Sequence, residues 1–253
     1  MIRYGVRVLR FILAWAITIG MSSLQLVCTA LGCGRWGWER IPHAWSVMTF
    51  AALGVKVRVK GVEHLKGPAV FVLNHQSLLD VALVPYILPR EILYVVKKEL
   101  QSVPIFGPAV CKMGAIAVDR RNTAAAVKSI KEGLAQMPGS YSVMVFPEGT
   151  RSLDGRVGAF KKGFAHIASV GKLPVIPIGI AGAYDCCGYN EAVPRPGVIE
   201  CTVGAPIRTD DWTVDTVNDR IPEVEKVVRG LASRSQERLA ERPLCMDTSA
   251  QAV

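Results

Sequence analysis

From position 55 onward, the chain alternates between short runs of β-branched and other apolar residues and longer amphipathic stretches. This alternation is typical of α/β proteins, because a helix between two strands returns the chain so that the second strand runs parallel to the first. The runs predicted as strands are 55–59, 69–73, 92–96, 115–118, 142–146, 175–180 and 198–203. The stretches predicted as helices lie near 78–87, 123–136, 159–171 and 214–240, and Pro222 either lies near the start of the last helix or kinks it. The alternation therefore predicts a layered α/β fold with a largely parallel or mixed central sheet.

An uncharged run precedes this region, over positions 11–34, and sixteen of its 24 residues are apolar. A helix of that length is about 36 Å long, which is enough to cross a hydrocarbon core of about 30 Å. A cleaved signal peptide is the main alternative, but the run is longer than the apolar region of such a peptide and no A-x-A site closes it. We therefore expect the segment to be retained and to associate with a membrane.

A second uncharged run, over 41–55, is short for a membrane span and suits an interfacial or packed helix. Arg3, Arg7 and Arg10 form one cationic stripe if the chain around them is helical. Basic residues flank both ends of the longer run, so the distribution of charge sets no clear orientation. We predict that residues 1–53 form a pair of membrane-associating helices on the cytosolic face, monotopic or re-entrant, with a single span as the other possibility.

The net charge of +9 predicts an anionic partner, which could be a membrane, a nucleic acid or a phosphorylated small molecule. The basic residues are not interleaved with aromatic ones and no nucleic-acid-binding motif is present, so no nucleic-acid partner is expected. The seven cysteines are odd in number and lack the spacing of a zinc site, so no metal site is predicted. Reduced thiols agree with a cytosolic environment.

The predicted strand 69–73 ends directly in the sequence NHQSLLD, at positions 74–80. If Ser77 caps the next helix, His75 lies in the loop before it and Asp80 in its first turn, so the carboxylate can turn back to the imidazole. A histidine held in one tautomer by a carboxylate can serve as a general base. The other interpretation makes Asp80 a partner of the helix dipole and His75 a structural loop residue. This segment alone leaves both interpretations open.

Two further predicted strands also end in polar residues. The first ends in VDRR, which contains Arg120, and the second in FPEGTRS, which contains Glu148, Gly149, Thr150 and Arg151. Arginine binds phosphate oxygens in a bidentate manner, and the free amides of a tight turn add to the same anion site. Polar clusters at the strand ends of an α/β sheet are expected to converge on one edge.

Together, NHQSLLD, GAIAVDR, FPEGTRS and VIPIGI resemble the four ordered motifs of the 1-acyl-glycerol-3-phosphate acyltransferase family. The stretches YVVKKEL and AFKKGFAHIA are similar to that family as well. The resemblance implies a glycerolipid-acyltransferase-like α/β domain, which we expect over 54–242, with a C-terminal tail over 243–253. It also implies transfer of an acyl chain from an acyl thioester, acyl-CoA or acyl carrier protein, to the sn-2 hydroxyl of lysophosphatidic acid, which gives phosphatidic acid for phospholipid synthesis.

The resemblance also implies roles for individual residues. His75 would take the proton of the acceptor hydroxyl, and Asp80 would orient the imidazole and stabilise its protonated form. The acceptor phosphate site would include, directly or as its support, Arg120, Glu148, Gly149, Thr150 and Arg151, with Lys98 or Lys97 as a neighbour. No metal, acyl-enzyme or cofactor is expected, since the acyl thioester is itself a co-substrate, and membrane lipids are the expected surroundings.

Two alternatives stay open at this point. The first is the same reaction on another acceptor, such as glycerol-3-phosphate or a different lysophospholipid. The second is a non-catalytic lipid-binding relative, which the intact pair of His75 and Asp80 disfavours.

Overall fold

The computed structural model describes residues 2–88, 92–105, 107–108, 116–118, 142–213 and 216–241. The helix predicted near 123–136 and the C-terminal tail lie outside the described residues. The α-helices are α1 (Ile2–Ala30), α2 (Gly34–Leu53), α3 (Asp80–Ile87), α6 (Gly163–Gly171), α7 (Ala183–Cys186) and α8 (Val217–Glu241), and η1 (Val62–His64) and η2 (Lys98–Ser102) are 3-10 turns. The strands are β1 (Val55–Lys60), β2 (Val70–Leu73), β3 (Ile92–Lys97), β4 (Ile116–Val118), β5 (Ser142–Val145), β6 (Val175–Ala181) and β7 (Gly197–Val203).

The strands form one mixed sheet in the order β1-β7-β6-β2-β5-β3-β4. Strands β6, β2, β5, β3 and β4 are parallel neighbours, while β6 and β7 pair antiparallel and β7 pairs parallel with β1. The predicted α/β class with a largely parallel, mixed sheet is confirmed. Because five neighbouring strands run the same way, their carboxyl ends lie along one edge of the sheet, where ligand sites of α/β proteins are found.

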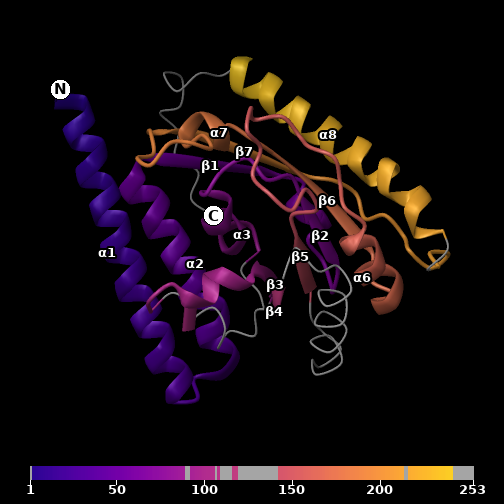
Figure 1. The fold of residues 1–253 in the computed structure, drawn as a ribbon, viewed down its shortest axis with the longest axis horizontal. Coiled ribbons are helices and arrows are strands. Elements are labelled where there is room, and N and C mark those ends of the chain that lie inside the picture. The colour runs from indigo at the N-terminus through magenta and orange to yellow at the C-terminus, as the bar shows by residue number, and fades with distance from the viewer. Residues whose placement is uncertain are drawn as a thin grey trace.

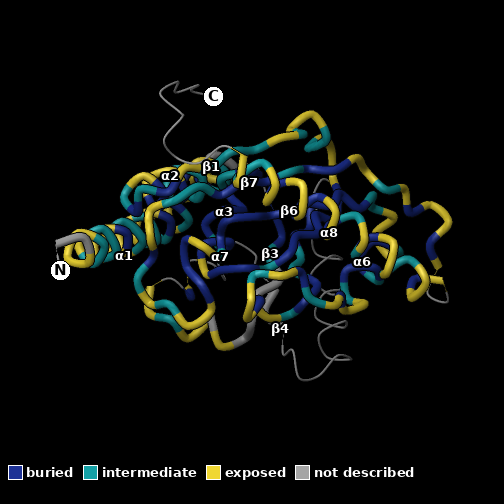
Figure 2. The backbone as a smooth tube through the Cα atoms, turned by 90° about the horizontal axis from the view of Figure 1, so that it is seen from above, coloured by how far each residue is buried: buried dark blue, intermediate teal, exposed yellow. Residues whose placement is uncertain are grey.

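Helices cover both faces of the sheet, and the side chains of β2 show why (Figure 1). Phe71 and Leu73 pack into a core that includes α2 and α3, whereas Val70 and Val72 pack into a second core with α6 and α8. Successive side chains of a strand point to opposite faces, so a strand buried on both faces is apolar throughout. All four of these side chains are fully buried, and the central strands are dark blue in Figure 2.

One glycine allows α8 to lie close to the sheet. A Cβ at Gly179 in β6 would lie 2.3 Å from the backbone nitrogen of Ala232 and 2.5 Å from the carbonyl carbon of Leu231. Only a residue without a side chain permits this approach of helix backbone to strand. Pro222 lies in the second turn of α8, inside the helix.

Two helices begin later than expected because of hydrogen bonds made by the residues just before them. The helix predicted from 159 begins at Gly163, because the N–H of Phe160 donates to Glu225 and the N–H of Lys161 donates to the carbonyl of Pro147. The helix expected after Ser77 begins at Asp80, and the Ser77 hydroxyl accepts a hydrogen bond from the N–H of Leu79 at 3.2 Å. Ser77 therefore stabilises the turn that precedes α3 and is not the N-cap residue of the helix.

Helices α1 and α2 pack side by side as an antiparallel pair, and α2 in turn packs on α3 (Figure 1). Helix α1 is long and apolar enough to cross a membrane by length and composition, and only 17% of its most apolar window is buried by the protein. Its outward-facing side chains are Tyr4, Val6, Leu9, Ile12, Leu13, Trp15, Ile19, Leu24 and Val27. An apolar face of this extent is typical of a surface that contacts lipid or a partner.

Two polar side chains of α2 fix the position of α3. The hydroxyl of Ser46 donates to the carbonyl of Ala82 at 2.5 Å, and Nδ1 of His43 donates to the carbonyl of Pro85 at 3.0 Å. The Pro85 carbonyl needs such a partner because position 89, four residues later, is also proline and has no N–H. The helical pair is thus hydrogen-bonded to the helix that carries Asp80.

Candidate active site

The end of β2 is fastened to β6 by the side chain of Asn74. Its Nδ2 donates to the carbonyl of Ile180 at 3.0 Å, and its Oδ1 accepts from the N–H of Ile180 at 2.7 Å. Asn74 is fully buried, and it continues the strand pairing by one residue through its amide group. The following residue, His75, therefore starts from a fixed point at the carboxyl edge of the sheet.

His75 and Asp80 form a hydrogen-bonded pair, as the sequence predicted they could. Nδ1 of His75 donates to Oδ2 of Asp80 at 2.8 Å. The same oxygen accepts the N–H of Gln76 at 2.7 Å and the N–H of Ser77 at 2.8 Å, while Oδ1 is buried and has no partner among the described residues. Asp80 is fully buried, so one carboxylate oxygen holds both the loop and the ring orientation.

The backbone of His75 is held from the FPEGTRS segment. Its N–H donates to Oε1 of Glu148 at 2.9 Å, and its carbonyl accepts the N–H of Ser152 at 2.8 Å. The other oxygen of Glu148 accepts the N–H of Gly158 at 3.0 Å. Burial raises the pKa of the Glu148 carboxyl above its ordinary value, and the hydrogen bonds from His75 and Gly158 partly offset this. Glu148 therefore supports the loop of His75.

The ring of His75 stacks on Phe146, with centroids 4.2 Å apart and planes 17° from parallel. The side chain is 12% exposed. Because Nδ1 donates to Asp80, Nε2 is the ring nitrogen that can accept a proton from a bound molecule. This is the arrangement of a general base that a carboxylate orients.

His75 lines an apolar cavity of about 430 Å³ between the helical pair and the sheet domain. The walls come from α1, α2, the start of α3 and the segment after α7, and the lining also includes Arg151 and Cys187. The apolar lining includes Phe11, Ala14, Trp15, Trp45, Leu53, Leu78, Leu79, Val81, Ala82, Val103, Ala192 and Pro194. A cavity of this size is within the range of small-molecule sites, and its walls suit a long hydrocarbon chain.

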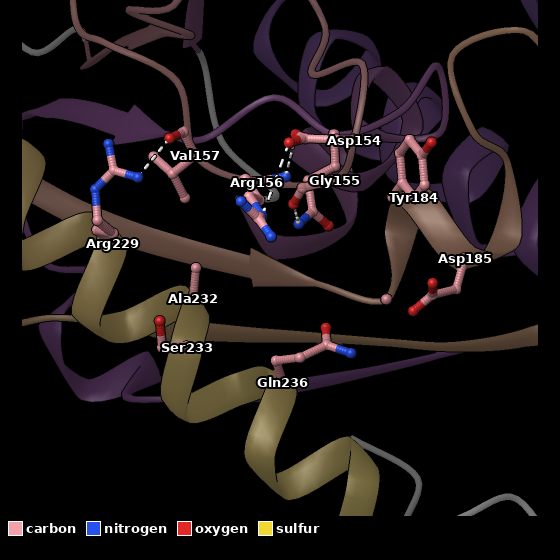
Figure 3. Close-up of a pocket in the computed structure, with 12 residues that line it drawn as sticks. Asp154, Gly155, Arg156, Val157, Tyr184, Asp185, Arg229, Ala232, Ser233 and Gln236 are labelled. Carbon is pink, nitrogen blue, oxygen red and sulfur yellow. Dashed lines mark hydrogen bonds and ion pairs between the residues drawn. The ribbon is translucent and has the colours of Figure 1, made fainter.

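A second cavity, of about 400 Å³, is lined by Gln76. Its wall also includes the segment 154–157 and residues of α7 and α8, which are labelled in Figure 3. The amide of Gln76 donates to the carbonyl of Gly155 at 2.6 Å, and Arg229 of α8 donates to the carbonyl of Val157 at 2.6 Å. The N–H of Arg156 donates to Asp154 at 3.0 Å. These contacts hold the 154–157 segment in the wall of this cavity. His75 and Gln76 are neighbours in the chain but line different cavities.

The other residues predicted for the phosphate site differ in their surroundings. Gly149 has φ +73° and a Cβ there would lie 2.8 Å from Nζ of Lys161, so the turn requires glycine. Thr150 is exposed, and the guanidinium of Arg151 lies over the ring of Tyr189 at 4.9 Å from its centroid. Lys97 ends β3 and Lys98 begins η2 at the same sheet edge, and their side chains lie outside the described part. Arg120 lies outside the described residues as well.

The structure thus brings His75, Asp80, Glu148 and Arg151 together from separate strand ends. Sequence reasoning assigned no role to Asn74, Phe146 and Ser152, although all three lie inside the motifs it singled out. It gave no sign of the cavity walls contributed by α1, α2 and the segment after α7. Those walls are long-range contacts between ordinary apolar residues, and no spacing in the sequence marks them.

Residues 56–181 match the family model described as Acyltransferase, and this range contains the histidine, the aspartate and the FPEGTRS segment. The chain belongs to the acyltransferase family. The resemblance identified from the motifs is confirmed.

This acyltransferase-family chain is similar to proteins named 1-acyl-sn-glycerol-3-phosphate acyltransferase from several organisms. It is 37% identical to the one from Limnanthes douglasii over 70% of this chain, and 34% identical to the one from Cocos nucifera over 73% of this chain. It spans 64% of the length of each of these two curated relatives. The yeast Saccharomyces cerevisiae protein is 29% identical over 89% of this chain and 74% of its own length.

A solved structure shares the fold. It is that of the 1-acyl-sn-glycerophosphate (LPA) acyltransferase PlsC from Thermotoga maritima, with a TM-score of 0.79 and 24% sequence identity. The match covers 95% of this chain and 97% of that one, including the N-terminal helices as well as the sheet. The shared fold therefore includes the helical pair that lines part of the apolar cavity.

Proposed function

We propose that the protein transfers an acyl chain from an acyl thioester, acyl-CoA or acyl carrier protein, to the sn-2 hydroxyl of lysophosphatidic acid. The product would be phosphatidic acid. The observation that carries this proposal is the pair of His75 and Asp80 at the wall of an apolar cavity of about 430 Å³. The names of the similar proteins support the choice of acceptor.

The reaction follows from the position of the imidazole. The acceptor hydroxyl oxygen attacks the thioester carbonyl carbon as Nε2 of His75 takes the hydroxyl proton. The buried carboxylate of Asp80, 2.8 Å from Nδ1, stabilises the positive charge that this transfer places on the ring. The tetrahedral intermediate then breaks its carbon–sulfur bond, and the thiolate that leaves takes the proton from His75. A thiol of pKa about 8.5 leaves readily, so a strong general acid is not needed.

The apolar cavity would hold an acyl chain and the FPEGTRS segment the acceptor phosphate. Apolar burial contributes about 0.8 kcal/mol per methylene, so a chain that fills the cavity binds tightly without polar contacts. Arg151 lines the same cavity as His75, and its guanidinium would pair with the phosphate of the acceptor. Glu148 acts here as the support of the His75 loop.

The exposed apolar face of α1 supports attachment to a membrane. We propose a monotopic arrangement at the cytosolic face, in which α1 lies against lipid on one side and against α2 on the other. The polar groups of α2 favour this over insertion of both helices, because Ser46 and His43 are engaged with α3. Basic residues of the protein would add attraction to anionic lipids of about 1 kcal/mol each when near the surface.

The test is release of thiol from a long-chain acyl-CoA by the detergent-solubilised protein, with and without lysophosphatidic acid. We expect release that depends on the acceptor in the wild-type protein and its loss in His75→Ala. A panel of acceptors that includes glycerol-3-phosphate and other lysophospholipids identifies the preferred one. Failure with acyl-CoA and with acyl carrier protein on every acceptor would overturn the proposal.

A second variant tests the phosphate site. Arg151→Ala should raise the KM for the phosphorylated acceptor while leaving the KM for the acyl donor close to the wild-type value, because the guanidinium would contact only the acceptor. An unchanged acceptor KM would remove Arg151 from the site.

A further inference from the structure

The acyl cavity has a roof that belongs to no helix or strand. It is the segment 187–196 between α7 and β7, and Cys187, Ala192 and Pro194 of this segment line the cavity. Proline occupies two of its positions, 194 and 196, and has no N–H to donate, so the segment cannot be held by regular backbone pairing. Its position depends on contacts from elsewhere.

One end of this roof segment is fastened beside the histidine. The hydroxyl of Ser77 donates to the carbonyl of Cys187 at 2.7 Å, and the N–H of Arg195 donates to the carbonyl of Cys186 at 2.7 Å. Within the segment, Glu191 accepts a hydrogen bond from the side chain of Arg195. These bonds close the segment into a loop. They do not involve its middle part, residues 192–194, which needs a contact from another element.

The middle part is held by Arg7 of α1. Nη2 of Arg7 donates to the carbonyl of Val193 at 2.6 Å, and Nε donates to the carbonyl of Pro194 at 3.2 Å. The guanidinium also lies over the ring of Tyr4, 5.8 Å from its centroid. A planar fork of N–H groups suits two successive carbonyls, whereas a lysine ammonium is a single point of donation on a flexible stem.

Arg7 lies on the face of α1 that lines the cavity. Phe11, Ala14 and Thr18 follow it at helical spacings of four, seven and eleven residues, and all three line the cavity wall. The same helix face thus provides one wall of the cavity and the contact that holds its roof. The sequence placed Arg7 in a cationic stripe of the helix, and the structure shows its guanidinium bonded to two carbonyls of the protein.

We propose that Arg7 is a positioning residue that holds the roof segment 187–196 closed over the bound acyl chain and so determines the affinity for long-chain donors. This rests on the proposed acyltransferase function. Without the two hydrogen bonds, the roof lifts from α1 and the chain loses part of its apolar surroundings. Each methylene left unburied weakens binding about fourfold, so the effect grows with chain length.

The kinetic test compares Arg7→Ala and Arg7→Lys with the wild-type protein, using a long-chain and a short-chain acyl-CoA. We expect Arg7→Ala to raise the KM for the long-chain donor about tenfold, from the loss of two charge-assisted hydrogen bonds, with kcat nearly unchanged. The KM for the short-chain donor and for the acceptor should change little. Arg7→Lys should be intermediate, because it keeps the charge and at most one of the two bonds. Arg234→Ala, at an exposed position of α8 that lines neither cavity, is the control for loss of a positive charge.

A second measurement does not depend on activity. Cys187 is buried in the cavity wall, so its alkylation by iodoacetamide, followed residue by residue by mass spectrometry, reports opening of the roof. We expect alkylation of Cys187 to be severalfold faster in Arg7→Ala than in the wild-type protein, with Cys201 in the sheet core as the buried reference.

The two measurements separate the possible failures. If the wild-type protein releases no thiol with any acceptor and Cys187 is still alkylated faster in Arg7→Ala, Arg7 holds the roof segment but the acyltransferase function is removed. The role of Arg7 is overturned if the wild-type protein is active and Arg7→Ala changes neither the KM for the long-chain donor nor the alkylation rate of Cys187. Equal acceleration at Cys187 and Cys201 would indicate general unfolding and would also overturn it.

Discussion

Replacement of Asp80 by asparagine isolates the negative charge beside His75 from the hydrogen bonds that it makes. Oδ2 accepts all three hydrogen bonds, from His75, Gln76 and Ser77, and Oδ1 has no partner among the described residues. The amide oxygen of an asparagine can take the place of Oδ2 and the amide nitrogen the place of Oδ1. The variant Asp80→Asn therefore keeps the loop geometry and loses only the charge.

The size of the effect follows from the distance. Two unit charges 2.8 Å apart attract by about 332/(20 × 2.8), or about 6 kcal/mol, at an effective dielectric constant of about 20. That attraction exists only when the ring is protonated, which is during proton transfer, so it lowers the barrier rather than the ground state. Its loss corresponds to about 10⁴ in kcat, the order known for a buried His–Asp pair of this kind.

The assay is acceptor-dependent thiol release under saturating substrates, with urea denaturation of both proteins in parallel. We expect kcat to fall by about 10³ to 10⁴, while the free energy of unfolding falls by only about 1–3 kcal/mol from the unpaired amide nitrogen. An Asp80→Asn protein that retains a tenth or more of the wild-type kcat would refute the electrostatic role of Asp80. A variant that is largely unfolded would refute the argument that its hydrogen bonds survive.

Three further outcomes are expected. Because burial raises the pKa of Glu148 in the folded state, its protonation stabilises the fold at low pH and this contribution is lost as the pH rises through the raised pKa. In urea titrations, the free energy of unfolding of the wild-type protein minus that of Glu148→Gln should increase as the pH falls from neutral toward 4.5. A difference that does not change with pH would contradict this. Ala14→Phe fills part of the apolar cavity, so competition between acyl-CoA species should shift the preference to shorter chains by about fourfold per displaced methylene; an unaltered preference would place the chain elsewhere. Gly149→Ala puts a side chain at φ +73° against Lys161 and should lower the free energy of unfolding by about 1–2 kcal/mol, whereas an unchanged urea midpoint would show that the turn tolerates a Cβ.

The strand pattern of this chain was largely readable from its sequence. The predicted strands agree with β1 to β7 within about one residue at either end, because residues such as Val70 to Leu73 are apolar at every position and the turns between strands are rich in glycine, proline and asparagine. The helix starts were less accurate, since the N–H groups of Phe160 and Lys161 donate to Glu225 and to the carbonyl of Pro147 and so delay the start of α6. Such bonds join residues that are far apart in the chain, and periodicity carries no information about them.

The pairing of His75 with Asp80 was also predictable, since both residues lie in one short segment whose geometry is local. The contact partners of Glu148 were not predictable: its carboxylate accepts a hydrogen bond from the backbone N–H of His75, which depends on β2 and β5 being neighbours in the sheet. Phe146 stacks on His75 for the same reason.

By itself, the sequence determined the α/β class, the apolar N-terminal helices and the residues available for chemistry, because these depend on composition, spacing and contacts within a few residues. Only the tertiary structure decided that α1 and α2 line an apolar cavity at His75, and that Arg7 of α1 donates hydrogen bonds to the segment 187–196. The difference has a physical cause. Helix and strand periodicity reports which faces of an element are apolar, whereas the partner of each face is fixed by packing between segments that lie tens of residues or more apart in the chain.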